Sequence, residues 1–192
     1  MKQGEASLPS LNIALGIAAL VAPALHSLTD VMEWRHSGFS ATQLWLNYIA
    51  FLPMPWLLLG MYSAHEPRPS VVGLVGALLY GVAFTYFAHT TLYALTEQIS
   101  TYDALWARLG VLYTVHGSLM VLGGLMFAWS ALQVGWLPRG ALLLFAAGLI
   151  WNFLLALLPA PDILQTIGSA ARNAGLMAMG YAILFNRHRN AA

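Results

Sequence analysis

Residues 71–97 read VVGLVGALLYGVAFTYFAHTTLYALTE, a run that carries no charged side chain before its last residue. A helix needs about 20 mainly apolar residues to cross the hydrocarbon core of a bilayer, so this run is long enough to span one. Stretches of the same character lie on both sides of it, separated by short breaks rich in turn-forming residues. The six segments are roughly Leu11–Glu33, Gln43–Ser63, Val71–Glu97, Ala104–Gln133, Gly140–Leu158 and Ile163–Phe185. The sequence therefore predicts an all-α integral membrane protein, a single bundle of about six transmembrane helices.

The composition supports this class. Of the 192 residues, 59% are hydrophobic and only 8% are charged, whereas an average soluble domain carries roughly 25% charged residues. Lipid needs no charged protein surface, so membrane lipid is the expected surrounding of the bundle. The net charge of +1 and the lack of a basic run give no reason to expect nucleic acid as a partner. The chain has no Cys, which excludes disulfides and thiolate chemistry. We expect one polytopic domain over residues 1–192.

Basic residues are unevenly distributed over the breaks between the segments. Cytoplasmic loops of membrane proteins carry an excess of Lys and Arg. If the N-terminus is inside, most basic residues fall on the cytoplasmic side, and Arg35 and Arg108 fall outside. We therefore expect both the N-terminus and the C-terminus to be cytoplasmic, in the plasma (inner) membrane of a bacterium. The basic residues on the cytoplasmic side are then Lys2, Arg68, Arg139, Arg187 and Arg189.

Two of the segments have features that could change this plan. Residues 22–24 read Ala-Pro-Ala, the small-x-small form of a signal-peptide cleavage site. Only Lys2 is basic in the stretch before the apolar run, and Glu5 and Pro9 interrupt that stretch, so we expect the first segment to be retained. The second segment contains Pro53 and Pro55, each of which removes a backbone donor. A kink is therefore predicted there.

Ionisable side chains lie inside the segments, mostly toward their outer ends. The first segment has His26, Asp30 and Glu33 on one helix face, at i, i+4 and i+7. A charge near the bilayer centre costs on the order of 3 kcal/mol, so these groups should turn inward and satisfy one another. We expect Arg172 to pair with one of the acids. The predicted polar pocket in the outer half of the bundle is formed by His26, Asp30, Glu33, His89, Tyr93, Glu97, His116 and Arg172.

Such a pocket predicts binding of, or action on, a lipophilic small molecule by acid/base chemistry. Burial raises the pKa of a carboxyl group and a neighbouring Arg lowers it, so carboxylates at different depths can divide into acid and base. The eight pocket residues are the candidate catalytic residues. Their arrangement is similar to that of small polytopic isomerases and cyclases that protonate isoprenoid substrates, and no motif assigns a family. An isomerase, a cyclase or a hydrolase would fit this interpretation.

Other functions remain open at this point. His89 and His116 lie on consecutive segments and could be the axial ligands of a haem b in an electron-transfer protein. His26, His89 and His116 with Asp30 could instead hold a zinc ion and its bound water. A proton-coupled transporter would use the same acids and imidazoles as a relay. A homo-oligomer could supply the path across the membrane that a single unit lacks as a transporter. An accessory subunit of a larger membrane complex would explain the short chain.

Overall fold

The computed structural model of the chain describes residues 8–64, 67–158 and 161–185. All regular structure within these ranges is helical, which confirms the predicted all-α class. The long helices follow the apolar runs already noted, and the described turns between helices contain Gly, Pro and Ser residues. The helices are α1 (Leu8–His36), α2 (Ala41–Phe51), α3 (Met54–Ala64), α4 (Val71–Thr96), α5 (Tyr102–Leu109), α6 (Val111–Val134), α7 (Arg139–Leu155) and α8 (Asp162–Phe185).

Four helical segments of the described ranges are long and apolar enough to cross a membrane: Leu11–His36, Ala41–Ala64, Val71–Thr96 and Val111–Val134. The apolar helix α7 has 17 residues, or about 26 Å, slightly less than the roughly 30 Å of a hydrocarbon core. Helix α8 has 24 residues and carries several polar side chains, and it is not among these four segments. The chain is thus a helical bundle with several helices suited to a membrane.

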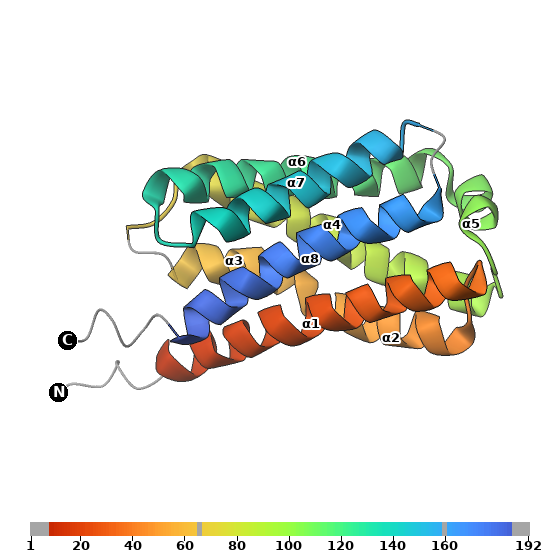
Figure 1. Ribbon diagram of the computed structural model, residues 1–192, viewed down its shortest axis with the longest axis horizontal. Helices are drawn as coiled ribbons and strands as arrows, with labels where there is room; N and C mark the ends of the chain where they lie inside the picture. The colour runs from red at the N-terminus through yellow and green to blue at the C-terminus, as the bar shows by residue number, and fades with distance from the viewer. Residues whose placement is uncertain (1–7, 65–66, 159–160, 186–192) are drawn as a thin grey trace.

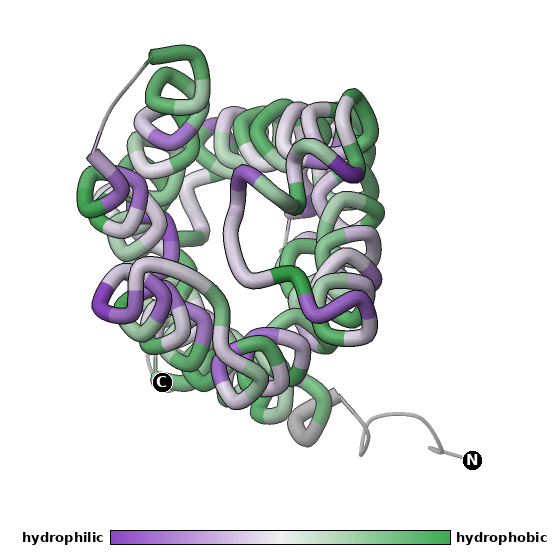
Figure 2. The backbone as a smooth tube through the Cα atoms, turned by 90° about the vertical axis from the view of Figure 1, so that its right-hand side faces the viewer, coloured by the Kyte–Doolittle hydropathy of each residue, from purple (hydrophilic) through white to green (hydrophobic). Residues whose placement is uncertain are grey.

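The long helices form a closed ring (Figures 1 and 2). Around it, α1 is followed by the α2–α3 pair, then by α4, α6, α7 and α8, and α8 packs against α1 to close the ring. At one end, on the right of Figure 1, lie the last turns of α1 and α4, the first turn of α8, and α5. We call this the acidic end, because five carboxylate side chains lie in or near these turns: Asp30, Glu33, Glu97, Asp103 and Asp162. At the opposite, basic end lie Arg68, in the turn before α4, and Arg139, the first residue of α7.

Two predicted segments are not continuous helices. The second is interrupted between α2 and α3, at Leu52 and Pro53, which confirms the kink predicted from its prolines. The prediction that the fourth segment is one unbroken helix over 104–133 is wrong. The segment breaks at Gly110, which has a φ of 53° that favours glycine, and the short helix α5 precedes α6. Helix α5 therefore lies at the acidic end, and the long helix begins only at Val111.

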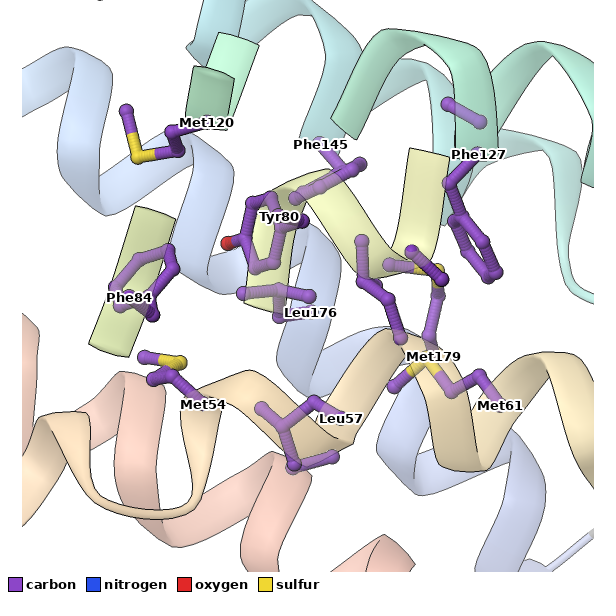
Figure 3. Packing of buried hydrophobic residues seen from close by; sticks show 14 of the residues in the cluster. Met54, Leu57, Met61, Tyr80, Phe84, Met120, Phe127, Phe145, Leu176 and Met179 are labelled. Atoms are coloured by element: carbon purple, nitrogen blue, oxygen red, sulfur yellow. The ribbon is translucent and has the colours of Figure 1, made fainter. Parts of the chain in front are cut away.

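The centre of the ring is packed with aromatic, Met and Leu side chains (Figure 3). Tyr80, Phe84, Phe127 and Phe145 are among the largest fully buried side chains, and they come from α4, α6 and α7. Met54 and Leu57 of α3, together with Leu176 and Met179 of α8, fill the space between them. Large apolar side chains also stand exposed on the long helices, as lipid-facing surfaces require. Examples are Ile17, Trp56, Leu78, Leu122 and Leu143.

Helices α4 and α6 approach each other closely where two glycines meet. A Cβ added at Gly76 would lie 2.6 Å from the carbonyl oxygen of Gly123 and 2.6 Å from the backbone nitrogen of Phe127. Both atoms belong to the backbone, so neither can move aside without shifting a helix. The same test at Gly117, also within α6, finds no atom within 4 Å.

We predict that Gly76→Ala lowers the free energy of unfolding by about 1–3 kcal/mol, because the added methyl group overpacks the α4–α6 contact. Gly117→Ala is the matched control. It should be neutral or stabilising by up to about 1 kcal/mol, since Ala is favoured over Gly within a helix. Reversible unfolding of the purified protein in mixed micelles measures both. Equal effects of the two substitutions would contradict the close approach.

Candidate functional site

His26 and Arg172 meet in the middle of the bundle. His26 lies 10 residues before the end of α1, and Arg172 lies 10 residues after the start of α8. At 1.5 Å per residue, both are about 15 Å from the acidic end. Both are buried, His26 with 7% and Arg172 with 3% of its surface exposed. A cation at this depth needs partners from within the protein.

A chain of contacts runs from Arg172 to Asp30. Arg172 Nη2 lies 3.1 Å from His26 Nδ1, and His26 Nε2 lies 3.3 Å from Asp30 Oδ1. Asn173, the residue after Arg172, accepts hydrogen bonds from Arg172 Nε and Nη2 at its Oδ1, both at 3.3 Å. Arg172 Nη1 donates to the Met120 sulfur at 3.2 Å. Of the carboxylates in the described residues, none is within ion-pair distance of Arg172, so the expected direct pair with an acid is wrong.

The hydrogen bonds determine the tautomer of His26. A guanidinium group can only donate, so His26 Nδ1 must be the acceptor of the Arg172 contact. The amide nitrogen of Asn173, a second donor, lies 3.4 Å from the same Nδ1. The ring is therefore neutral and carries its proton on Nε2, which faces Asp30. In this arrangement His26 joins a fixed cation to a carboxylate without itself being charged.

The surrounding helices hold this chain of contacts in place. Asn173 Nδ2 donates to Ser27 Oγ at 3.0 Å, which ties α8 to α1. On the other side of α1, Thr29 Oγ1 lies 3.1 Å from Asn47 Oδ1 of α2. Helix α7 can pack directly on the backbone of Arg172 because Gly148 has no side chain, since a Cβ there would collide with the Arg172 backbone nitrogen. The contacts of α8 with α1 and α7, and the contact of α1 with α2, thus limit where the Arg172 guanidinium can lie.

Several buried polar atoms near this network have no partner among the described residues. One is Asp30 Oδ2, the carboxylate oxygen that His26 does not contact. Another is the hydroxyl of Tyr80, a fully buried side chain of α4. In Figure 3 this hydroxyl points toward the space between Phe84 and Met120, the two side chains that Arg172 also contacts. Buried polar groups in native proteins are nearly always hydrogen-bonded, so these two atoms are natural contact points for a ligand or water.

The other predicted pocket residues lie elsewhere. Glu33 is one turn from Asp30, nearer the acidic end, and is partly buried. Tyr93 packs in a small separate cluster with Leu44, Ala94, Ile99 and Leu105. Glu97 forms an exposed ion pair with Arg108 at 3.7 Å, an interaction that is typically worth at most about 1 kcal/mol. Of the eight predicted residues, the structure joins His26, Asp30 and Arg172.

His89 and His116, the remaining predicted site residues, lie in different surroundings. His116 is buried, and its ring stacks on Tyr86 with a centroid separation of 4.5 Å. His89 is exposed and lines a groove between α2–α3 and α4. No group of three or more His, Asp or Glu side chains in the described ranges is placed to hold a metal ion, so the zinc hypothesis has no ligand set there. The haem hypothesis, which needs His89 and His116 on one iron, stays a prediction.

Some side chains of the network were not predicted from the sequence. Asn47, Thr29 and Ser27 are small or uncharged polar residues within apolar runs, where they are usually taken as packing residues. The hydroxyl of Tyr80 gave no signal, because tyrosines are common throughout this chain. Asn173, adjacent to Arg172, was the one informative hint. An amide beside an intramembrane cation is a ready acceptor for it.

The arrangement at the centre of the bundle is a buried cation held by neutral acceptors and joined through an imidazole to a carboxylate. Comparisons of the chain with protein-family models, with curated proteins and with solved structures give no match. The function is therefore inferred from the chemistry of these side chains.

We predict that His26→Leu lowers the free energy of unfolding by about 3 kcal/mol or more, because it removes an acceptor from a buried guanidinium. Glu97→Gln, which breaks the exposed pair with Arg108, is the control and should cost less than about 1 kcal/mol. Reversible unfolding in mixed micelles again provides the measurement. Similar losses for both variants would mean that the buried network contributes no more than a surface ion pair.

Proposed function

We propose that this protein binds an uncharged lipophilic molecule in the outer, acidic half of its bundle and exchanges a proton with it at Asp30. The observation that carries the proposal is the chain Arg172–His26–Asp30, which ends in a buried carboxylate oxygen with no partner among the described residues. Structural ion pairs normally satisfy both carboxylate oxygens, whereas a general base needs one oxygen free.

Asp30 is better suited to proton exchange than His26. For His26 to take up a second proton at Nδ1, it would have to lose the donors that Arg172 and Asn173 present there. Asp30 Oδ2 is free to accept a proton from a ligand, which turns the carboxylate into a carboxylic acid. The Asp30 side chain retains 16% of its accessible surface, whereas Oδ2 itself is buried, so a ligand must enter the bundle to reach this oxygen. His26 and Arg172 are then positioning residues.

The nature of the ligand follows from the surroundings of the network. A charged ligand would face the cost of entering the bilayer centre, so an uncharged one is favoured. Met120 occupies one donor of Arg172, and a thioether is only a weak acceptor. A ligand oxygen would be a stronger partner for that guanidinium, and the unpartnered Tyr80 hydroxyl is close to the same two side chains. A hydroxyl or carbonyl group on a hydrocarbon body fits these contacts.

Our proposal also includes six membrane spans, with both chain ends in the cytoplasm. Helices α7 and α8 pack side by side, and α8 lies along the full-length span α1. Exposed apolar side chains such as Leu144, Ile150 and Phe153 make α7 unsuited to water. The basic residues Arg68 and Arg139 lie at the end opposite the acids, as the positive-inside rule requires for a cytoplasmic end.

Proton exchange is tested with isoprenoid and straight-chain alcohols and aldehydes, for example farnesol and farnesal, added to the purified protein in weakly buffered micelles. At least one compound should raise the melting temperature. In D2O the aldehydes should also gain deuterium at a carbon activated by the carbonyl group, as mass spectrometry reports, because Asp30 removes a proton there and returns a solvent deuteron. Asp30→Asn should abolish this deuterium uptake, because an amide cannot act as the base. Asp103→Asn, at an exposed position in α5, is the control and should leave it unchanged.

Two outcomes of that experiment would overturn the proposal. One is that none of the compounds stabilises the wild-type protein. The other is that the compounds gain deuterium equally fast with Asp30→Asn and with the wild-type protein.

The topology is tested by single cysteines, since the chain has none of its own. In intact cells, a membrane-impermeant maleimide should label Ser37→Cys and Pro161→Cys, which are exposed at the acidic end. Gln133→Cys, near the basic end, should react only after the membrane is permeabilised. If Pro161→Cys and Gln133→Cys react from the same side, α7 does not cross the membrane.

A further inference from the structure

A groove of about 330 Å³ opens where the second span is interrupted. Phe51, Leu52 and Trp56 form one wall, and Thr85, His89 and Leu92 of α4 form the other. Both walls belong to segments long and apolar enough to cross a membrane, 41–64 and 71–96, so acyl chains surround the opening. Its volume is at the lower end of the roughly 300–1,000 Å³ typical of small-molecule sites.

The two prolines of the interrupted span produce the groove. Pro53 and Pro55 carry no N–H, so the carbonyls of Ile49 and Phe51 have no helical donor. The chain bends away there, and α4 approaches the bend because Gly81 has no side chain. A Cβ at Gly81 would lie 2.8 Å from the carbonyl oxygen of Pro55. The interruption between α2 and α3 thus packs directly on α4 at Gly81.

His89 is the imidazole of this groove, and Tyr48 is a second polar side chain of its lining. His89 lies seven residues before the end of α4, or about 10 Å from the acidic end, and its side chain is exposed. The hydroxyl of Thr85, the other polar side chain of that wall, is already used, since it donates to the Gly81 carbonyl at 3.0 Å. An imidazole facing hydrocarbon is costly unless a partner satisfies it. A neutral ring offers one donor and one acceptor, which a hydroxyl or a carbonyl group can use.

Phe51 connects the groove to the buried network. It lines the groove and also contacts the ring of His26, edge to face, with a centroid separation of 4.7 Å. The groove is therefore one side chain away from the chain of contacts that ends at Asp30. A ligand seated against Phe51 from the bilayer would lie beside the proposed reaction site without first passing through water.

We propose that this groove binds, directly from the bilayer, a single-chain lipid whose uncharged head group is a hydroxyl or a carbonyl hydrogen-bonded to His89. The choice of head group rests on the proposed function. The groove and the exposed imidazole are independent of it.

The test uses two photoreactive probes, a C16 alcohol with a diazirine on its chain and the matching hydrocarbon without the hydroxyl. The wild-type protein is labelled in phosphatidylcholine nanodiscs, and the modified peptides are identified by mass spectrometry. Labels should fall within residues 48–56 and 85–92. The alcohol should label roughly two- to tenfold more than the hydrocarbon, the ratio expected for one hydrogen bond.

Three variants separate the contributions. His89→Leu should bring the ratio of the two probes to about one, because it removes the head-group partner and keeps the groove. Thr85→Trp should fill the groove and suppress both labels. Val82→Trp, exposed on the same helix but outside the groove, is the control and should leave both labels unchanged. Labels spread evenly over exposed apolar positions, or a preference for the alcohol that survives His89→Leu, would overturn the proposal.

Failure of this inference can be told apart from failure of the proposed function. Asp30→Asn should leave the groove labels unchanged, because Asp30 does not line the groove. If the groove is labelled as expected and no compound moves a proton at Asp30, the groove stands and the proposed function fails. If a proton moves and the labels avoid the groove, the reverse holds.

Discussion

The structure depends on how one guanidinium group is accommodated in the middle of an apolar bundle. Arg172 has no carboxylate beside it in the described part of the chain, and it is held by an imidazole, an amide oxygen and a thioether. These acceptors come from α1, α6 and α8. Leaving such a group unsatisfied would cost several kcal/mol, so the three helices must keep the register that brings the acceptors together. The same requirement explains why α8 closes the ring against α1.

The two ends of the ring solve different problems. Toward the basic end, Phe127, Met61 and Met179 fill the centre, and the contact of Gly76 with Gly123 brings α4 and α6 together. Such packing holds helices together in a membrane, where water does not drive them to associate. Toward the acidic end, polar side chains replace part of this packing. Hydrogen bonds there take the place of apolar contacts between helices. The described residues of this half include buried polar atoms without a hydrogen-bond partner.

Much of the fold could be predicted from the apolar runs, but the site could be predicted only in part. The spacing of His26 and Asp30 on one helix gave their contact correctly, because i and i+4 lie on one face. The partner of Arg172 could not be deduced, since it lies 146 residues away and depends on which helices are neighbours. Glu97 was assigned to the pocket on spacing alone. The break at Gly110, which turns α5 aside, gives that acid a surface partner instead.

The imidazole between Arg172 and Asp30 changes what the carboxylate can do. Two opposite charges about 4 Å apart attract by about 4 kcal/mol at an effective dielectric constant of 20, and the attraction halves when the distance doubles. A direct pair would therefore hold the carboxylate charged. With His26 in between, the cation is farther from Asp30 and attracts the carboxylate less strongly. Because Arg172 also determines the tautomer of His26, the carboxylate keeps one hydrogen bond and one free oxygen. A direct pair with Arg172 could occupy both carboxylate oxygens with guanidinium donors, whereas the separated arrangement leaves Oδ2 without a partner among the described residues.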